Sequence, residues 1–186
     1  MKRVIYHRDN QKLWVWDQWA SDATVDLFLQ HIPWQQNSIR VYGKMHLEPR
    51  LTAWFGPDYQ YANVRWPHTP WPDFMREWRQ RIQLVCGVDF NAVLCNLYRS
   101  GNDAMGWHAD NEPEIDPTCI ASLSFGASRT FKIKQRKGES LFDVELQHGT
   151  LLVMENMQSD WLHAVPRRLK VTEPRINFTF RKIRTA

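Results

Sequence analysis

A run of short apolar segments after Gly87 constrains the fold of this 186-residue chain more than any other feature. Each segment is bounded by Gly, Asn, Asp, Pro or charged residues, as β-strands commonly are. The segments are FNAVLCNLYR, TCIASLSFG, RTFKIKQ, LFDVEL, GTLLVMEN and RINFTFRKI, and KGES between the third and fourth is typical of a hairpin turn. So many consecutive strands predict a β-sandwich or jelly roll.

The part of the chain before these strands contains two segments with helical periodicity. SDATVDLFLQHI has apolar residues on one face and offers Ser21 or Asp22 as an N-cap. PDFMREWRQRIQLVCG has Pro72 near its first turn and ends at Gly87. A helical first half followed by strands predicts an α+β domain in which the helices pack on one sheet.

Composition narrows the class of protein. The length suits one domain with a substantial core, and ten tryptophans indicate a core or a binding surface rich in flat rings. The net charge of +4 permits a polyanionic partner without requiring one. The three cysteines have no CxxC spacing, which favours a reducing compartment over a disulfide framework or a zinc knuckle. Without a signal-like or bilayer-length apolar run, we expect an intracellular protein, cytoplasmic or in the nucleoid or nucleus.

His108-Ala109-Asp110 places an imidazole and a carboxylate two positions apart. On an extended backbone these side chains share a face, so they can converge on Fe(II), Mn(II) or Zn(II). The candidates for a third ligand are His148 in QHGT and His163 in DWLHAVP. Two histidines and one carboxylate form the facial triad of non-haem Fe(II) oxygenases. The alternative is a loop in which His108 and Asp110 only hydrogen-bond to each other.

The segment PRINFTFRKI alternates polar and apolar residues with the period of a strand. Its polar face carries Arg175, Asn177, Thr179 and Arg181. Arginine pairs with carboxylates in bidentate fashion, so two guanidinium groups on one face suit a small dicarboxylate. The alternative is a half-exposed strand whose polar face contacts water.

Taken together, HAD, the distal His163 and RINFTFR resemble the signature HxD…H…RxNxTxR of the AlkB family of Fe(II)- and 2-oxoglutarate-dependent dioxygenases. The resemblance covers about residues 40 to 183 and includes PRLTAWFG, CNLYRSG, ASLSFGASRTF and HGTLLVME. These stretches look most like the nucleic-acid demethylases related to the human second and third AlkB homologues.

The resemblance implies a single domain with a double-stranded β-helix (jelly roll) core and N-terminal helices on one sheet. An N-terminal extension and helix would occupy about residues 1–39. Nucleotide-recognition hairpins would form a lid over about 40–65, and the jelly-roll core would span about 88–183.

The resemblance also implies a ligand set. His108, Asp110 and His163 would bind Fe(II), and His148 would not. Arg175 and Tyr98 would hold the distal carboxylate of 2-oxoglutarate. The end that chelates iron would contact Arg181 and Asn96, supported by Asn177 and Thr179. For Asn96 and Tyr98, the alternative is an ordinary pair on an edge strand.

The implied activity is oxidative N-demethylation of 1-methyladenine and 3-methylcytosine in DNA, with RNA as a second candidate. O2 and 2-oxoglutarate would be consumed, and succinate, CO2 and formaldehyde released. We expect a monomer with no membrane or protein partner. Two alternatives remain: a dioxygenase of the same fold acting on a protein or small molecule, and a nucleic-acid-binding module without catalysis.

Three residues resemble the family's base pocket. Tyr61 would stack on a flipped base opposite the His108 ring, and Tyr59 would reach a polar edge or a phosphate. Glu112 would lie near the exocyclic amine of the base, where a carboxylate also suits a base made cationic by methylation. The alternatives are two core aromatic residues and a solvated loop acid.

IRVYGKMHLEPR resembles the hairpin that precedes this pocket. Tyr42 stands where a relative acting on double strands uses an aromatic wedge. Arg40, Lys44 and Arg50 would contact phosphates. The alternative is a β-turn with ordinary surface charges. Because PRLTAWFG resembles the relative acting on single strands instead, the sequence leaves the strand preference open.

Overall fold

The structure is a computed structural model that describes residues 1–41, 44–61 and 64–184. Within them the chain is mostly β-structure with two helices, α1 (Val25–His31) and α2 (Asp73–Cys86). The strands are β1 (Lys2–Arg8), β2 (Gln11–Trp16), β3 (Ser38–Val41), β4 (Lys44–Leu47), β5 (Leu51–Phe55), β6 (Tyr59–Tyr61), β7 (Val64–Trp66), β8 (Ala92–Tyr98), β9 (Met105–His108), β10 (Cys119–Gly126), β11 (Arg129–Gln135), β12 (Leu141–Leu146), β13 (Thr150–Glu155), β14 (Trp161–Val165) and β15 (Arg175–Arg181). None of the helices described is long and apolar enough to cross a membrane.

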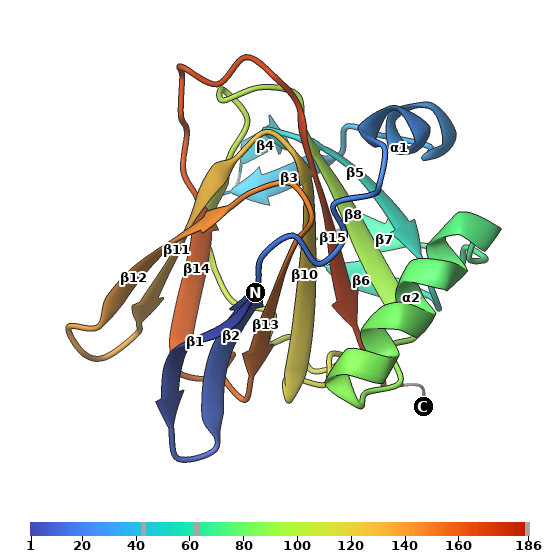
Figure 1. Ribbon diagram of the computed structural model, residues 1–186. Helices are drawn as coiled ribbons and strands as arrows, with labels where there is room; N and C mark the ends of the chain where they lie inside the picture. The colour runs from blue at the N-terminus through green and yellow to red at the C-terminus, as the bar shows by residue number, and fades with distance from the viewer. Residues whose placement is uncertain (42–43, 62–63, 185–186) are drawn as a thin grey trace.

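Two sheets form the layers of a jelly roll. The large sheet has seven strands in the order β1-β2-β13-β10-β15-β8-β5, and the small sheet has four in the order β12-β11-β14-β9. Figure 1 shows the small sheet, the large sheet and the helices as successive layers. One apolar cluster, which includes Phe131 and Leu152, fills the space between the sheets. The predicted jelly roll is therefore confirmed.

The outer face of the large sheet packs against both helices. The Phe28 ring of α1 lies 4.9 Å, between centroids, from both Phe125 and Phe178 of the sheet. Trp78 of α2 lies 5.5 Å from Phe125. Strand residues alternate between faces, so the apolar side chains of β10 and β15 face the helices. Their polar side chains consequently face the other sheet, where a pocket can form.

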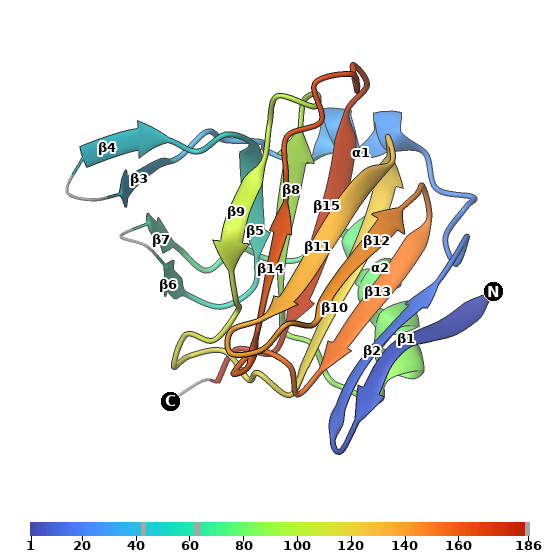
Figure 2. The same cartoon turned by 90° about the vertical axis from the view of Figure 1, so that its left-hand side faces the viewer.

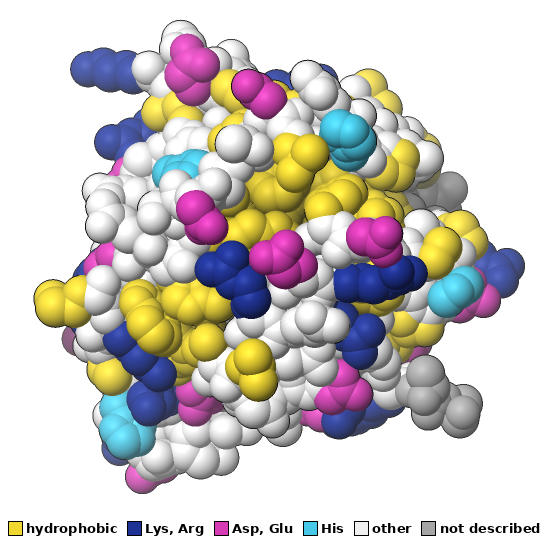
Figure 3. Space-filling view, turned by 45° about the vertical axis from the view of Figure 1, so that its right-hand side comes forward, with side chains coloured by type: hydrophobic (Ala, Val, Ile, Leu, Met, Phe, Trp, Pro, Cys, Tyr) yellow, Lys and Arg dark blue, Asp and Glu magenta, His cyan; other side chains and the backbone are white. Residues whose placement is uncertain are grey.

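Several tryptophan rings lie beside arginines of α2. Arg79 lies 5.2 Å above the Trp71 ring, and Arg81 lies 4.9 Å from Trp19 and 4.5 Å from Trp78. In Figure 3 the side of the molecule that carries the helices comes forward, and charged side chains lie there among hydrophobic ones. The many tryptophans therefore serve, in part, the packing of helices on the sheet.

The expectation of a helical first half is wrong. Strands β1 to β7 precede α2 in the chain, and the hairpin β1–β2 extends the large sheet because β2 pairs with β13. The first helix has Thr24 as its N-cap, not Ser21 or Asp22. The second helix is as predicted, with Pro72 at its N-cap and a left-handed Gly87 at its C-cap.

Candidate functional site

A pocket between the two sheets is lined by polar side chains from both. Its polar lining consists of Glu48, Arg50, Thr52, Tyr59, Asn96, Tyr98, His108, Asp110, Glu112, Ser122, His163, Arg175, Asn177, Thr179 and Arg181. The pocket thus brings together every metal-site and dicarboxylate-site residue that the sequence predicted.

Three of these residues form a cluster suited to a metal. His108 ends β9, His163 lies on the adjacent β14, and the two are direct partners in the antiparallel register. Asp110 follows two residues after β9. One potential ligand atom from each of the three lies within 4.8 Å of the others. This is the arrangement of two histidines and one carboxylate that suits Fe(II).

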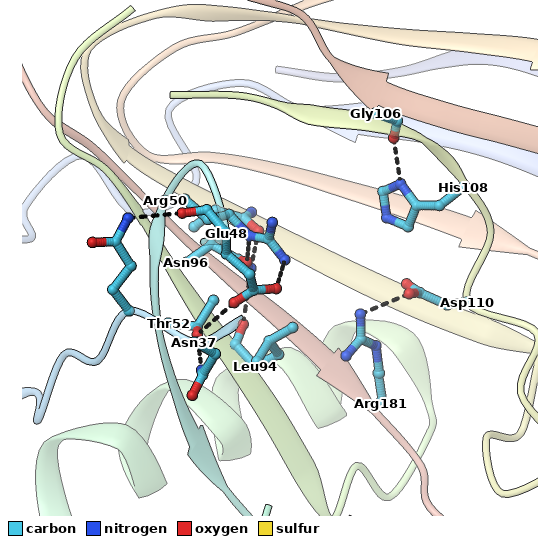
Figure 4. A network of polar contacts seen from close by, with 12 residues as sticks. Asn37, Glu48, Arg50, Thr52, Leu94, Asn96, Gly106, His108, Asp110 and Arg181 are labelled. Atoms are coloured by element: carbon cyan, nitrogen blue, oxygen red, sulfur yellow. Dashed lines mark hydrogen bonds and ion pairs between the residues drawn. The ribbon is translucent and has the colours of Figure 1, made fainter. Parts of the chain in front are cut away.

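Hydrogen bonds orient the ligand atoms of this cluster. His108 Nδ1 lies 2.8 Å from the Gly106 carbonyl oxygen, which can only accept, so Nδ1 carries the proton and Nε2 is left for a metal (Figure 4). Arg181 Nη2 donates to Asp110 Oδ1 at 2.7 Å. Asp110 Oδ2 is buried and has no hydrogen-bond partner among the residues that the structure describes. The donor set therefore fits a metal ion.

Burial and neighbouring charges set the ionisation of the cluster. Burial lowers the pKa of His163 to about 3 and also lowers the pKa of His108. Burial raises the pKa of Asp110, but the charge of Arg181, the charge that each histidine carries once protonated and the hydrogen bond from Arg181 outweigh burial, and the net pKa lies below the usual value. At neutral pH the cluster therefore presents two neutral imidazoles and one carboxylate, the forms that bind metals.

His148 lies outside this cluster. Its Nδ1 accepts a hydrogen bond of 3.1 Å from the Gly126 backbone N–H. Its ring packs against Phe125, 5.8 Å away between centroids, at the end of β10. His148 is thus not part of the cluster that His108, Asp110 and His163 form.

Arg175 is a buried cation with unused donors. Its Nη2 donates to Ser124 Oγ at 2.9 Å, and its guanidinium lies 5.2 Å from the Tyr98 ring centroid. Its Nε and Nη1 have no hydrogen-bond partner within the described part of the chain. Burial lowers the pKa of Arg175 to about 10, so the group still carries its charge at neutral pH. An anionic ligand would satisfy both the charge and the open donors.

A polar row crosses four neighbouring strands of the large sheet. Ser124, Asn177, Asn96 and Thr52 are successive register partners on β10, β15, β8 and β5. Asn177 donates to Ser122 Oγ at 2.7 Å and accepts from Thr179 Oγ1 at 2.8 Å. Asn177, Asn96 and Thr52 of this row give the pocket a polar floor, whereas the alternative of a half-exposed strand required these side chains to contact water.

The predicted base-binding residues lie at another part of the pocket. Tyr59 is buried and stacks on Trp54, with centroids 5.0 Å apart. Glu112 is partly buried, and burial raises its pKa. Its Oε2 atom is buried without a hydrogen-bond partner among the residues described. A carboxylate oxygen that faces the pocket in this way suits a cationic or hydrogen-donating ligand.

The residues predicted to contact nucleic acid from the first hairpin differ in their exposure. Arg50, which the sequence predicted to contact a phosphate, is buried with only 3% of the residue exposed, and it bonds to Glu48 and Asn96. Lys44 is exposed on β4. Tyr42 and the side chains of Arg40 and Tyr61 lie outside the described residues.

The sequence did not identify Glu48, Thr52 and Ser122 as residues that line the pocket. Nothing in the pattern distinguishes Glu48 from a surface acid. The alternation of CIASLSFG would have placed Ser122 and Ser124 on one strand face, opposite the apolar residues.

Residues 11–181 match the family model of the 2OG-Fe(II) oxygenase superfamily. The chain belongs to this superfamily. As its name states, Fe(II) and 2-oxoglutarate are the metal and the cosubstrate of its members, and the cluster and Arg175 fit them.

Curated relatives confirm the resemblance to the AlkB homologues. The human alpha-ketoglutarate-dependent dioxygenase alkB homolog 3 is 38% identical over 176 residues, covering 88% of this chain and 62% of the relative. The DNA oxidative demethylase ALKBH2 of Arabidopsis thaliana is 35% identical over 190 residues, covering 85% and 60%. Human ALKBH2 is 38% identical over 158 residues, covering 78% and 60%. This oxygenase chain thus spans about three fifths of the length of these relatives.

A solved structure of OsALKBH1 has the same fold. It superposes with a TM-score of 0.64 at 16% identity and covers 97% of this chain and 100% of that chain.

Proposed function

We propose that this protein is an Fe(II)- and 2-oxoglutarate-dependent dioxygenase that demethylates N-alkylated bases in DNA, with RNA as a second substrate. The distribution of charge in the pocket carries the proposal. Arg181 is paired with Asp110, and Arg50 with Glu48. Among the described residues of the pocket, Arg175 is left as a cation without a carboxylate, and Glu112 as a carboxylate without a cation. One anionic ligand beside Arg175 and one cationic ligand beside Glu112 would balance these two charges.

The anionic ligand in this proposal is 2-oxoglutarate. Arg175 binds its distal carboxylate, and Tyr98 lies against the guanidinium. Asn96 and Arg181 bind the end nearest the metal, and Asn177 and Thr179 support them. Arg181 has a further role, because its bond to Asp110 Oδ1 leaves Oδ2 for the metal.

Fe(II) is held by His108, Asp110 and His163. With 2-oxoglutarate and O2, the bound metal would supply the oxidation of an N-methyl C–H bond, so that the methyl carbon leaves the base as formaldehyde and 2-oxoglutarate ends as succinate and CO2. The residues of the chain hold the reactants in place and exclude water around them.

The cationic ligand is a base methylated at a ring nitrogen, as in 1-methyladenine or 3-methylcytosine. Such a base must leave the helical stack to enter a pocket between two sheets. Glu112 binds its positive charge, Tyr59 contacts its edge, and Tyr61 stacks on its face. A neutral methylated base would gain less from Glu112.

Two hairpins support a nucleotide-recognition lid over about residues 40–65. The pairs β3–β4 and β6–β7 form separate two-stranded sheets. Figure 2 shows both projecting on the same side of the two main sheets, beside β5 and β9. Lys44 is exposed on the first hairpin, where it can contact a phosphate. In this division of the single domain, residues 1–39 precede the lid and residues 88–183 form most of the jelly-roll core, to whose large sheet β1, β2 and β5 contribute further strands.

The test is mass spectrometry of a methylated oligonucleotide after incubation with Fe(II), 2-oxoglutarate and air. The expected result is loss of the methyl group with formation of succinate, and no change with His163→Ala. Succinate without demethylation would indicate a protein or small-molecule substrate. Oligonucleotide binding without succinate would indicate a module without catalysis, and either result would contradict the proposal.

A further inference from the structure

Glu48 and Arg50 form a buried ion pair in the pocket wall that has no part in the roles assigned above. Arg50 Nη2 lies 3.1 Å from Glu48 Oε1, and 4% and 6% of the two side chains are exposed. Glu48 directly follows β4, and Arg50 directly precedes β5. The pair therefore lies where the hairpin β3–β4 joins the large sheet. Figure 4 shows it beside Asn96 and Thr52.

Arg50 makes a second bond that reaches the floor of the pocket. Its Nε donates to Asn96 Oδ1 at 2.8 Å. A guanidinium can only donate, so the amide oxygen of Asn96 must face Arg50. The amide nitrogen then faces Asn177 Oδ1 and the Leu94 carbonyl, at 3.5 and 3.4 Å. Arg50 thus fixes which end of the Asn96 amide is presented to a ligand beside Asn177.

Glu48 is itself held from the other side. Its Oε2 accepts from Thr52 Oγ1 at 3.3 Å, and Thr52 Oγ1 accepts from Asn37 Nδ2 at 2.9 Å. Its backbone N–H donates to the Asn37 carbonyl at 2.8 Å. The carboxylate is therefore anchored to residues on both sides of the hairpin β3–β4, and this anchorage determines where Arg50 lies.

A buried ion pair is a poor device for stability alone, because desolvation of two charges offsets most of their attraction. Apolar residues of similar volume would fill the same space. What an apolar pair could not do is orient an amide. The pair lines the pocket together with Asn96, so its geometry bears on what the pocket binds.

We propose that Glu48 is a positioning residue for the cosubstrate. It holds Arg50 so that the Asn96 amide presents its N–H₂ group toward the ligand, and the affinity for 2-oxoglutarate consequently depends on an acid at the base of the hairpin. This inference rests on the proposed function in one respect, namely that Asn96 contacts 2-oxoglutarate.

Calorimetric titration of 2-oxoglutarate into Mn(II)-loaded protein without O2 tests the inference independently of turnover. Glu48→Gln should weaken 2-oxoglutarate binding about ten-fold, as loss of an orienting partner commonly does, while Mn(II) affinity stays within two-fold. Glu145→Gln is the matched control. Its carboxylate is paired with Arg168 and hydrogen-bonded to Ser128, outside the pocket lining, so binding should not change.

A double-mutant cycle decides whether Glu48 acts through Asn96. Asn96→Ala alone should weaken 2-oxoglutarate binding, and adding Glu48→Gln should cause no further loss. A purely structural role would give additive losses. Additive losses, or unchanged affinity in Glu48→Gln, would overturn the inference, as would failure of the unaltered protein to bind 2-oxoglutarate.

A second variant keeps the test decisive if Glu48→Gln unfolds. Arg50→Lys retains the charge beside Glu48 but lacks the guanidinium fork that reaches two partners. It should show the same loss of 2-oxoglutarate affinity while the protein remains folded, and full affinity in Arg50→Lys would contradict the inference. If 2-oxoglutarate binding falls in these variants but no methylated oligonucleotide is repaired by the unaltered protein, the proposed function fails and this inference stands.

Discussion

His108 and His163 are direct partners across β9 and β14, with ring centroids 4.2 Å apart. The sheet register therefore brings together two imidazoles that are 55 residues apart in the chain (163 − 108). A single residue of slip between these strands would move one of them to the opposite face. The cluster of His108, Asp110 and His163 is thus a product of strand pairing, and its geometry depends on the small sheet.

Removing one imidazole should destroy the site while leaving the fold intact. His163→Ala is expected to weaken Mn(II) or Fe(II) binding at least about 100-fold, more than loss of a residue that only orients a ligand. His148→Ala is the matched control, since His148 bonds to the Gly126 backbone instead. Metal titration followed by calorimetry measures both, and equal losses in the two variants would contradict the assignment.

Removing the unpaired guanidinium of Arg175 should weaken cosubstrate binding and leave metal binding unchanged. Arg175→Ala should weaken 2-oxoglutarate binding on the order of 100-fold or more, because removal of one partner from a buried charge pair commonly costs about 3–5 kcal/mol. Metal affinity should stay unchanged, since Arg175 makes no described hydrogen bond to the cluster. A cosubstrate affinity within a few-fold of the unaltered protein would refute the role.

The effect of replacing Glu112 on the rate of repair should depend on the charge of the methylated base. Glu112→Gln keeps the shape and removes the charge, so repair of cationic 1-methyladenine should slow roughly ten-fold more than repair of a neutral methylated base. Values of kcat/KM on matched oligonucleotides that differ only in the lesion provide the measurement. An equal loss on both lesions would assign Glu112 a structural role.

The sequence predicted the His108–Asp110 pair and the polar face of β15 because both depend on short spacings. His108 and Asp110 share a face at i and i+2, and RINFTFR keeps strict alternation. The resemblance to a known family was needed to choose His163 over His148. Spacing alone could not make that choice, since it depends on which strands are neighbours.

Other features depend on contacts that no local pattern contains. Arg50 is separated from Asn96 by 46 residues, so its burial could not be foreseen from its neighbours. The hairpin β1–β2 was missed because most side chains of β1 are exposed, and the hairpin gains its place in the large sheet only when β2 pairs with the distant strand β13. Long-range pairing, in both cases, decided what local periodicity left open.

Protonation of Asp103 in acid should destabilise the loop that joins β8 to β9. Burial raises the pKa of this carboxyl, but hydrogen bonds from the side chain and backbone of Arg99 outweigh burial, so its pKa is lower folded than unfolded. The resulting stabilisation is present above the unfolded pKa of about 3.8 and is lost as the pH falls through the folded pKa below that value.

Asp103→Asn should therefore lower the free energy of unfolding at neutral pH by about 1 kcal/mol, a modest value because the Arg99 side chain is half-exposed. Between pH of about 4 and 2, its stability should depend less on pH than that of the unaltered protein. Urea unfolding at several pH values measures this. Asp143→Asn, which breaks the exposed pair with Lys132, is the control. An unchanged acid profile in Asp103→Asn would exclude the linkage.

The form of the nucleic acid should be revealed by Tyr42, which lies in the sequence between β3 and β4 and outside the described residues. Extruding a base from a duplex costs a few kcal/mol, and an aromatic ring inserted in its place offsets part of that cost. Single strands need no such help. Tyr42→Ala should therefore slow repair in duplex DNA roughly ten-fold more than in single-stranded DNA.

Tyr61→Ala is the comparison. In the proposed function Tyr61 stacks on the base with either substrate, so this substitution should slow repair of single- and double-stranded DNA equally. Rates on matched single- and double-stranded oligonucleotides at one salt concentration measure the difference, since phosphate contacts vary with salt. Equal losses on the two substrates for Tyr42→Ala would leave the hairpin without a wedge, and would favour the single-strand preference that PRLTAWFG suggests.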